Sequence, residues 1–194
     1  MKKLVALLLI AAVAALVLAS VAFAKAGVEK AEFQADLASL NGSGASGEAE
    51  LKLENGLLEA EIESEGLAPG LGHLQHIHGF AQAVSECPTL AADANGDGLV
   101  DAGEGGPSYG PILVSFTATG DTSPASAGAL DRFPVADSEG EFEYERTFGI
   151  PANVGARLGD FAVVQHGVDL NGNGMYDSPF EVALPATCGV IEPK

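Results

Sequence analysis

Two histidines placed two residues apart are the first residues in this sequence whose types and spacing suit metal binding. They are His76 and His78, in the segment H-L-Q-H-I-H-G-F that runs from residue 73 to residue 80. On a β-strand this spacing points both side chains to the same face, roughly 7 Å apart along the chain. Because neutral imidazole is the commonest protein ligand for copper and zinc, the pair can share one ion.

A third histidine, His166, ends another predicted strand, V-V-Q-H. If that strand lies beside the one that carries His76 and His78, the three imidazoles can share one transition-metal ion. The alternative is a hydrogen-bonded structural role, which is the ordinary explanation for a single histidine. All four histidines of the chain, His73 included, lie in segments next to loops rich in Asp, Asn and Gly.

The first of these loops runs from Asp93 to Glu104 and fits the calcium-loop pattern D-x-[DN]-x-[DN]-G-x5-E without a mismatch. Calcium takes about six to eight oxygen ligands, and Gly98 permits the sharp turn that wraps a loop around the ion. Neither flank of the loop reads as helical, so we predict a calcium loop on a β-domain rather than an EF-hand. The alternative is a solvated Asp/Gly turn. The predicted ligands are Asp93, Asn95, Asp97, Leu99 through its carbonyl, Asp101 and Glu104.

A second loop repeats the pattern just after His166, with its final acid one residue later than the template requires. Two of its positions carry Asn in place of a carboxylate, so we expect weaker calcium binding here. An Asn/Gly turn without a metal is the alternative. The predicted ligands are Asp169, Asn171, Asn173, Met175 through its carbonyl, Asp177 and Glu181.

The elements that position these residues are predicted to be β-strands. Short stretches of alternating apolar and polar residues recur between Gly/Pro-rich turns, which is typical of an antiparallel sandwich or barrel. The clearest unit is a hairpin in which Asn55-Gly56 joins two alternating runs. The predicted strands are 33–37, 49–54, 58–63, 74–80, 112–119, 142–148, 161–166 and 180–184, with a loop at 120–136 and a helical turn at 151–158.

The first 24 residues predict a secretory signal peptide, because two lysines precede a long uncharged apolar run that ends in Ala-Phe-Ala. An uncleaved anchor is the alternative, since the run is somewhat long. After cleavage we expect a secreted chain with no membrane span, in which residues 25–46 form an N-terminal segment with the first strand and residues 47–194 form the β-domain. About 170 residues suit one domain with a sizeable core.

The acidic composition limits the possible partners. Without residues 1–24 the chain carries a net charge near −20, which repels nucleic acid and anionic membranes. Solubility or salt adaptation explains part of this charge and calcium loops explain the rest. Two cysteines in an exported chain most simply form one disulfide, Cys87–Cys188, with free thiols as the alternative.

Several short motifs occur together in a recognisable order. G-L-x-x-G-L at 66–71 leads into the His76-Ile-His78 pair, V-V-Q-H ends at His166, and C-G-V-I begins at Cys188. The set resembles copper/zinc superoxide dismutases and their divergent relatives, among them chordin-type CHRD domains, over about residues 45–191. The resemblance implies a Greek-key β-sandwich or flattened barrel in which His76, His78 and His166 converge as copper ligands. It also places Cys87 where the family's disulfide partner follows the H-x-H strand.

The chain departs from that family at its other functional positions. Ser108 stands where the family has the histidine that bridges copper and zinc, and no histidine lies between residues 79 and 165, so we expect no zinc site. The family's arginine before the last cysteine is missing, since residues 184–187 carry no charge. Superoxide is an anion that so acidic a chain attracts poorly, which argues against a fast dismutase. The two calcium-like loops fall at the family's two long loops, so calcium is expected to take over the structural task of zinc.

Three functions follow from these predictions. The favoured one is an exported metal-binding module with calcium in its loops and copper, or another transition metal, at the three histidines. The second is a superoxide dismutase-like copper redox enzyme that lacks the zinc site. The third is an adhesive or matrix domain with vestigial histidines. The sequence identifies no protein partner.

Overall fold

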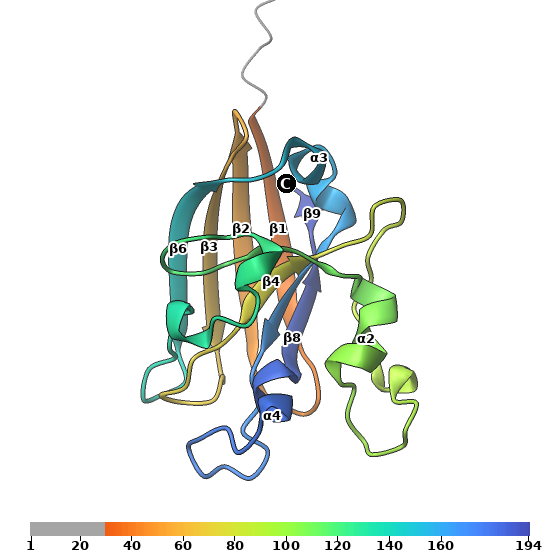
Figure 1. Cartoon of the computed structure of the whole chain (residues 1–194), viewed down its shortest axis with the longest axis vertical. Helices are drawn as coiled ribbons and strands as arrows, with labels where there is room; N and C mark the ends of the chain where they lie inside the picture. Colours follow the sequence, from red (N-terminus) through yellow and green to blue (C-terminus); the bar gives the residue numbers. More distant parts are fainter. Residues whose placement is uncertain (1–29) are drawn as a thin grey trace, which may run out of the picture.

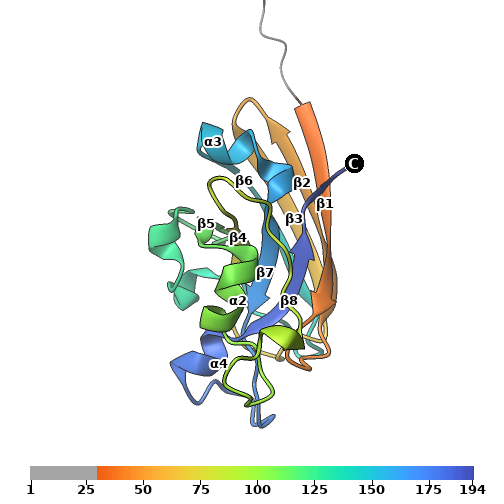
Figure 2. The same cartoon turned by 90° about the vertical axis from the view of Figure 1, so that its right-hand side faces the viewer.

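The computed structural model describes residues 30–194, and the signal peptide predicted for residues 1–24 lies outside that range. Within it, nine strands form one antiparallel sheet in the order β5-β4-β7-β8-β1-β2-β3-β6, with β9 beside β1. The sheet curls into two layers, and α2 and α4 lie on the side away from β1, β2 and β3 (Figures 1 and 2). The predicted all-β, antiparallel sandwich class is confirmed. The strands are β1 (Lys30–Ser39), β2 (Ser46–Glu54), β3 (Leu57–Glu65), β4 (Gln75–His78), β5 (Ile112–Ser115), β6 (Phe142–Gly149), β7 (Ala162–His166), β8 (Pro185–Val190) and β9 (Glu192–Pro193).

The predicted hairpin is the pair β2–β3, whose register places Leu51 opposite Ala60. Asn55 and Gly56 have positive φ angles of 55° and 78°, as the two-residue turns that match strand twist require. Leu51 and Ala60 are fully buried, whereas the alternating glutamates face outward. Period-two patterning therefore decides which face of this layer packs into the core.

Strand β1 joins the two layers. Its first eight residues pair with β2, and its last two, Ala38 and Ser39, pair with β8. Between the layers lies one core to which both contribute, with Leu51, Leu58 and Ile62 from one layer and Ile77, Val114 and Val163 from the other.

Alternation on β4 and β7 puts the histidines on the face opposite this core. Ile77 and Val163 are paired neighbours that point into the core, so His76 and His78 point outward from β4. His166 is the last residue of β7, and its N–H donates to the carbonyl of Leu74 at 2.7 Å. Because β4 and β7 are adjacent in the sheet, the three imidazoles share one face.

Residues 80–111 cover part of that face. They contain α2 (Ala102–Tyr109), and the predicted disulfide Cys87–Cys188 is formed, tying this segment to β8. A small second core lies beneath, where Tyr109 packs with Ala162 and Val164 of β7. The predicted disulfide is therefore confirmed.

Three sequence predictions were wrong. The strand predicted for 112–119 ends at Ser115, as β5, and the other two concern the ends of the calcium-like loops. Of the strand predicted for 180–184, residues 180–183 lie in the helix α4 (Pro179–Ala183), because Pro179 suits the first turn of a helix and the Ser178 side chain caps it. The last residues of the first loop begin the helix α2, although a non-helical flank was predicted. There the Asp101 side chain accepts from two backbone N–H groups and the Glu104 side chain returns to the Asp101 N–H, which forms a capping box.

The remaining connections contain short helical turns. The predicted helical turn at 151–158 is α3 (Ala152–Gly155), followed by the 3-10 turn η4 (Leu158–Asp160). The long loop before β6 holds two further 3-10 turns, η2 (Pro124–Ser126) and η3 (Leu130–Arg132). In the part of the chain that the structure describes, no helix combines the length and apolarity needed to cross a bilayer.

Candidate metal centre

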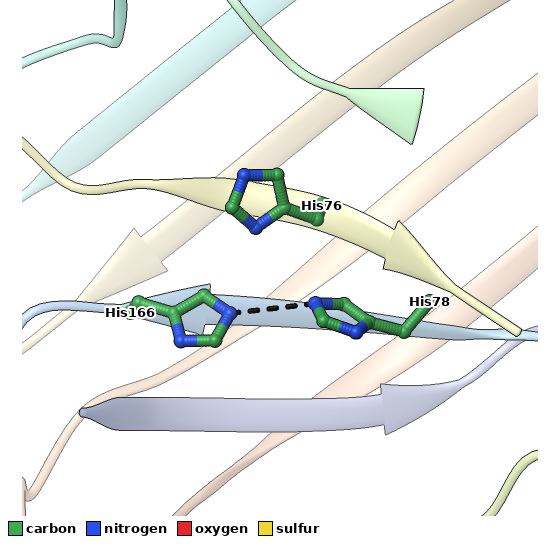
Figure 3. A group of neighbouring side chains, drawn as sticks. All are labelled: His76, His78 and His166. Carbon is green, nitrogen blue, oxygen red and sulfur yellow. Dashed lines mark hydrogen bonds between the residues drawn. The ribbon is translucent and has the colours of Figure 1, made fainter. Parts of the chain in front are cut away.

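Three histidines from two adjacent strands converge at one point. One ligand atom from each of His76, His78 and His166 lies within 4.8 Å of the other two, and all three residues are buried. Figure 3 shows the rings of His166 and His78 facing each other, with that of His76 directed at the space between them. The Nε2 atoms of His78 and His166 are 3.5 Å apart. The predicted convergence of these three residues is confirmed.

Backbone carbonyls fix which nitrogen of each ring carries the proton. His78 Nδ1 lies 2.8 Å from the carbonyl oxygen of Gly110, and His166 Nδ1 lies 2.8 Å from that of Ala183. His76 uses its other nitrogen, Nε2, which is 3.1 Å from the Ala127 carbonyl. A carbonyl only accepts, so each of these ring nitrogens is the donor. The opposite nitrogens, Nε2 of His78 and His166 and Nδ1 of His76, therefore carry lone pairs.

None of these three lone pairs receives a hydrogen bond from a donor in residues 30–194. His76 Nδ1 is the single buried side-chain nitrogen or oxygen within residues 30–194 that has no hydrogen-bond partner. The two Nε2 atoms that face each other are both acceptors in these tautomers, so neither donates to the other. A buried acceptor without a donor costs about 1–3 kcal/mol. A cation placed among the three nitrogens removes that cost, and this is how neutral imidazoles bind a metal.

Burial keeps the three imidazoles neutral. Desolvation holds the pKa of His76 well below its ordinary value, and the nearby His166 and His78 lower it further. Desolvation, with a smaller effect of His166, lowers the pKa of His78 to about 3. The pKa of His166 falls to about 4, again because of burial. Since metal ligands must be deprotonated, the centre is ready to bind a cation at neutral pH.

Aromatic side chains hold two of the rings in place. The Tyr109 ring packs edge-on against His78, with 4.6 Å between ring centroids, and Phe133 packs against His76 at 5.5 Å. Tyr109 is itself fixed, because its hydroxyl donates to the Ala102 carbonyl at 3.3 Å. The imidazoles are therefore preorganised by packing on one side and by backbone hydrogen bonds on the other.

The donor set suits copper or zinc. Three imidazole nitrogens are typical of both metals, and catalytic or exchangeable sites leave a further coordination position open. On the open side of the cluster lies a cavity of about 470 Å³. No further His, Cys, Asp or Glu of the described range belongs to the cluster, so the chain offers three protein ligands.

His73 plays the structural role that was the default expectation for a single histidine. Its Nδ1 lies 3.0 Å from the carbonyl of His166 and its Nε2 lies 3.1 Å from that of Ala68. The Tyr176 ring packs edge-on against it at 6.2 Å. His73 thus supports the backbone at His166 without belonging to the cluster.

The two calcium-like loops share one hydrogen-bond pattern. In each, the first Asp accepts from backbone N–H groups three and five residues later, at 2.7 and 2.9 Å for Asp93 and at 2.8 and 2.7 Å for Asp169. The final acids, Glu104 and Glu181, also correspond. Each side chain accepts hydrogen bonds from the backbone N–H groups of the second and the ninth residue of its loop. The distances are 2.9 and 3.1 Å for Glu104 and 3.2 and 2.5 Å for Glu181. The extra residue in the second loop therefore leaves the place of its final acid unchanged.

The other predicted oxygen ligands lie along the same two turns. Asn95 and Asn171 each accept from the N–H two residues later, at 2.8 and 3.0 Å. Over residues 30–194 no loop brings three carboxylates to within 4.8 Å of one another. The predicted oxygen ligands other than the first Asp and the final Glu are Asn95, Asp97, Leu99 and Asp101 in the first loop and Asn171, Asn173, Met175 and Asp177 in the second.

Sequence reasoning missed the groups that surround the imidazoles. The carbonyls of Gly110, Ala127 and Ala183 belong to the backbone, so no side-chain pattern marks them. Gly110 carries one usable signal, since its φ of 87° and a space in which a Cβ would lie 2.7 Å from the backbone of Gly79 demand glycine. Tyr109 adjoins Ser108 in the G-P-S-Y segment, and its contact with His78 was not predicted.

Comparison with known proteins adds little to this geometry. No protein-family model matches the chain, and no curated protein sequence matches it significantly. Among solved structures, the chain is similar to Candida albicans superoxide dismutase 5 with Cu(II), at a TM-score of 0.47 and 13% identity, over 86% of this chain and 94% of that chain. At that TM-score and identity the similarity carries no argument about function.

Proposed function

We propose that this protein is an exported metal-binding module that holds copper, or another transition metal that prefers imidazole, between His76, His78 and His166. The observation that carries the proposal is the unpartnered, buried Nδ1 of His76, aimed at two further imidazole lone pairs. A protein that used these histidines only for packing would pair or expose them. The disulfide supports export, since such bonds persist in oxidising compartments.

The protein's own groups prepare the ligands. The carbonyls of Gly110, Ala127 and Ala183 select the tautomers and orient the rings. Carbonyl acceptors of this kind also raise the basicity of the opposite nitrogen. Bound copper would supply one-electron redox chemistry at this position, and zinc would supply none.

Metal titration of the purified chain tests the proposal. We expect one equivalent of copper bound with nitrogen ligands in its paramagnetic resonance spectrum. His166→Gln should weaken binding by at least about 100-fold, since loss of a mere supporting hydrogen bond already costs about 10- to 100-fold. His73→Gln is the comparison variant, because His73 is a buried histidine that supports the backbone at His166 but gives no lone pair to the cluster, so its loss should weaken binding much less than that of His166. No copper or zinc uptake by the parent protein, or equal losses in both variants, would contradict the proposal.

Calcium in the two Asp/Asn loops is the second part of the proposal. The common hydrogen-bond pattern of the loops supports it, since Glu104 and Glu181 occupy equivalent places although their spacing differs. We propose that calcium orders the two long loops that flank the histidine layer, the structural task that zinc performs in other proteins. Calorimetry should detect heat on calcium addition, and the melting temperature should rise with calcium. Absence of both effects would rule calcium out.

A superoxide dismutase-like copper enzyme is the second candidate function. It is favoured by the open side of the three-histidine cluster, where a small substrate can approach a bound metal. The net charge of −18 opposes an anionic substrate. A superoxide assay on copper-loaded protein separates the two. Activity that disappears in His166→Gln would favour the enzyme, and undetectable activity in the parent protein would favour the module.

A further inference from the structure

The cavity beside the histidine cluster has an almost entirely apolar lining. It measures about 470 Å³, roughly the liquid volume of fifteen waters. Within the described range none of its lining residues carries a charge. Besides the three imidazoles and several glycines, the side chains that define it include Leu74, Tyr109, Pro111, Ile112, Ala127 and Ala183.

We propose that this cavity binds an uncharged ligand with an apolar body that completes the coordination of the metal through one donor atom. This inference rests on the proposed metal site and assigns the class of ligand that the site accepts. An apolar lining with one strongly directional polar partner is the usual composition of a small-molecule site. Here the directional partner is the metal that the three imidazoles would hold.

The polar groups at the cavity wall are already engaged. The Tyr109 hydroxyl donates to the Ala102 carbonyl at 3.3 Å, and burial raises its pKa to about 12, with Asp101 acting in the same direction. The carbonyls of Ala127 and Gly110 accept from His76 and His78. An anion in the cavity would therefore find no side-chain hydrogen-bond donor, and apart from the bond to the metal nothing would replace its lost hydration.

No cationic side chain compensates for that loss. Arg132 belongs to the loop that contributes Ala127 to the wall, but its Nη2 donates to the Ser126 hydroxyl at 2.8 Å and the residue does not line the cavity. Ser126 donates in turn to Asp121 at 2.7 Å. The chain as a whole is strongly acidic, with 27 acids against 9 basic residues. Both the local lining and the long-range field thus favour an uncharged ligand over an anion.

Competition between three probes tests this inference on the full, copper-loaded chain. Imidazole and 4-phenylimidazole offer the metal the same kind of donor and differ in one apolar ring, whereas azide is a small anion. We expect 4-phenylimidazole to bind at least about tenfold more tightly than imidazole, because the cavity removes its phenyl ring from water. Azide should bind more weakly than either. The shift of the copper absorption band and of its paramagnetic resonance spectrum reports binding without any assay of activity.

A substitution at a glycine in the cavity wall tests whether the apolar probe occupies the cavity. Gly128 lines the cavity and a Cβ added there meets nothing within 4 Å, so a larger side chain has room at this wall and Gly128→Leu is expected to narrow the cavity. It should weaken 4-phenylimidazole by about tenfold or more and leave imidazole within about threefold, because only the larger probe needs the filled space. Gly149→Leu is the matched control, since Gly149 also has open surroundings and lies on β6, away from the cavity. It should change neither affinity.

The outcomes separate this inference from the function on which it rests. Copper binding with equal affinity for the two azoles, or with azide as the tightest probe, would overturn the ligand class and leave the metal site standing. Failure of the chain to bind either copper or zinc would overturn the metal site and the inference together. Equal effects of Gly128→Leu and Gly149→Leu would show that the apolar probe binds elsewhere.

Discussion

The histidine cluster and the two Asp/Asn loops satisfy their polar atoms in opposite ways. Each histidine of the cluster gives one nitrogen to a backbone carbonyl and leaves the other without a donor, and His76 Nδ1 is fully enclosed in this condition. In the loops, by contrast, Asp93, Asp169 and the final acids Glu104 and Glu181 accept from backbone N–H groups of their own turns.

This difference has a consequence for ion binding. At the cluster a metal ion meets lone pairs that have no other partner, so binding removes a desolvation cost already present in the folded protein. At the loops calcium must compete with hydrogen bonds that already hold the turns closed. Under the proposed function the cluster would bind its ion with little rearrangement, whereas the loops would have to exchange existing hydrogen bonds for calcium.

Removing the disulfide breaks the covalent link between the two regions and has the largest expected effect. Cys87 lies just before the first loop, and Cys188 pairs in register with Val164 on the strand that ends at His166. Closure over a separation of 101 residues is worth about 4–5 kcal/mol in the chain-entropy model. The double variant Cys87→Ala/Cys188→Ala should lose about that much free energy of unfolding in denaturant titration.

The same double variant should keep its copper affinity. The cluster is held by β4, β7 and their carbonyl partners, none of which involves a cysteine. A loss of stability below about 1 kcal/mol would contradict the entropic role of the bond. Loss of copper binding from a folded variant would show that the disulfide is needed to keep Gly110 and Tyr109 of the covering segment against His78.

Mild acid should affect the histidine cluster and leave the loop carboxylates almost unchanged, so the two regions can be distinguished without a mutation. The folded-state pKa values of His78 and His166, about 3 and 4, lie below the ordinary value of 6.5, so between these limits the unfolded chain binds more protons than the folded chain. Stability is thus complete above pH 6.5 and falls as the pH falls through this window. Near pH 5 the metal-free protein should have lost about 2 kcal/mol for each of these histidines.

Denaturant unfolding of chelator-treated protein between pH 7.5 and 5 measures this loss. Most carboxylates stay ionised in that range, so the loop acids contribute little to the change. The variant His78→Gln should show a shallower decline, because one titrating group is gone. A stability that stays flat from pH 7.5 to 5 would mean that water or alternative pairing satisfies the imidazolium forms.

Much of this architecture is encoded in patterns that the sequence displays. Alternation around Asn55-Gly56 defines the β2–β3 hairpin, and the same parity places His76 and His78 on one face. The helix α4 was missed because Phe180, Val182 and Leu184 alternate like a strand, whereas Pro179 and the Ser178 cap determine the local backbone.

The choice of ligand nitrogen at the cluster was not accessible from the sequence at all. It depends on carbonyls at Gly110, Ala127 and Ala183, which come from three separate segments and have no side-chain signature. The apolar nature of the cavity was hidden for the same reason, because its wall is assembled from short stretches far apart in the chain. Long-range assembly, rather than local propensity, sets the chemistry of the site.

The smallest expected effect distinguishes one loop from the other. The first loop carries Asp97 where the second carries Asn173, so it offers calcium one more carboxylate and should bind more tightly. At a calcium concentration about 100 times the dissociation constant a site stabilises the fold by about 2.7 kcal/mol, and at ten times by about 1.4 kcal/mol. Glu104→Gln should therefore remove the larger part of the calcium-dependent rise in melting temperature, and Glu181→Gln the smaller part.

These variants form a matched pair, because both acids bridge the same two loop positions and Gln keeps one acceptor oxygen for them. Equal losses would show that the two loops bind calcium alike in spite of their charge, and no loss in either would show that the hydrogen-bonded turns are complete without an ion.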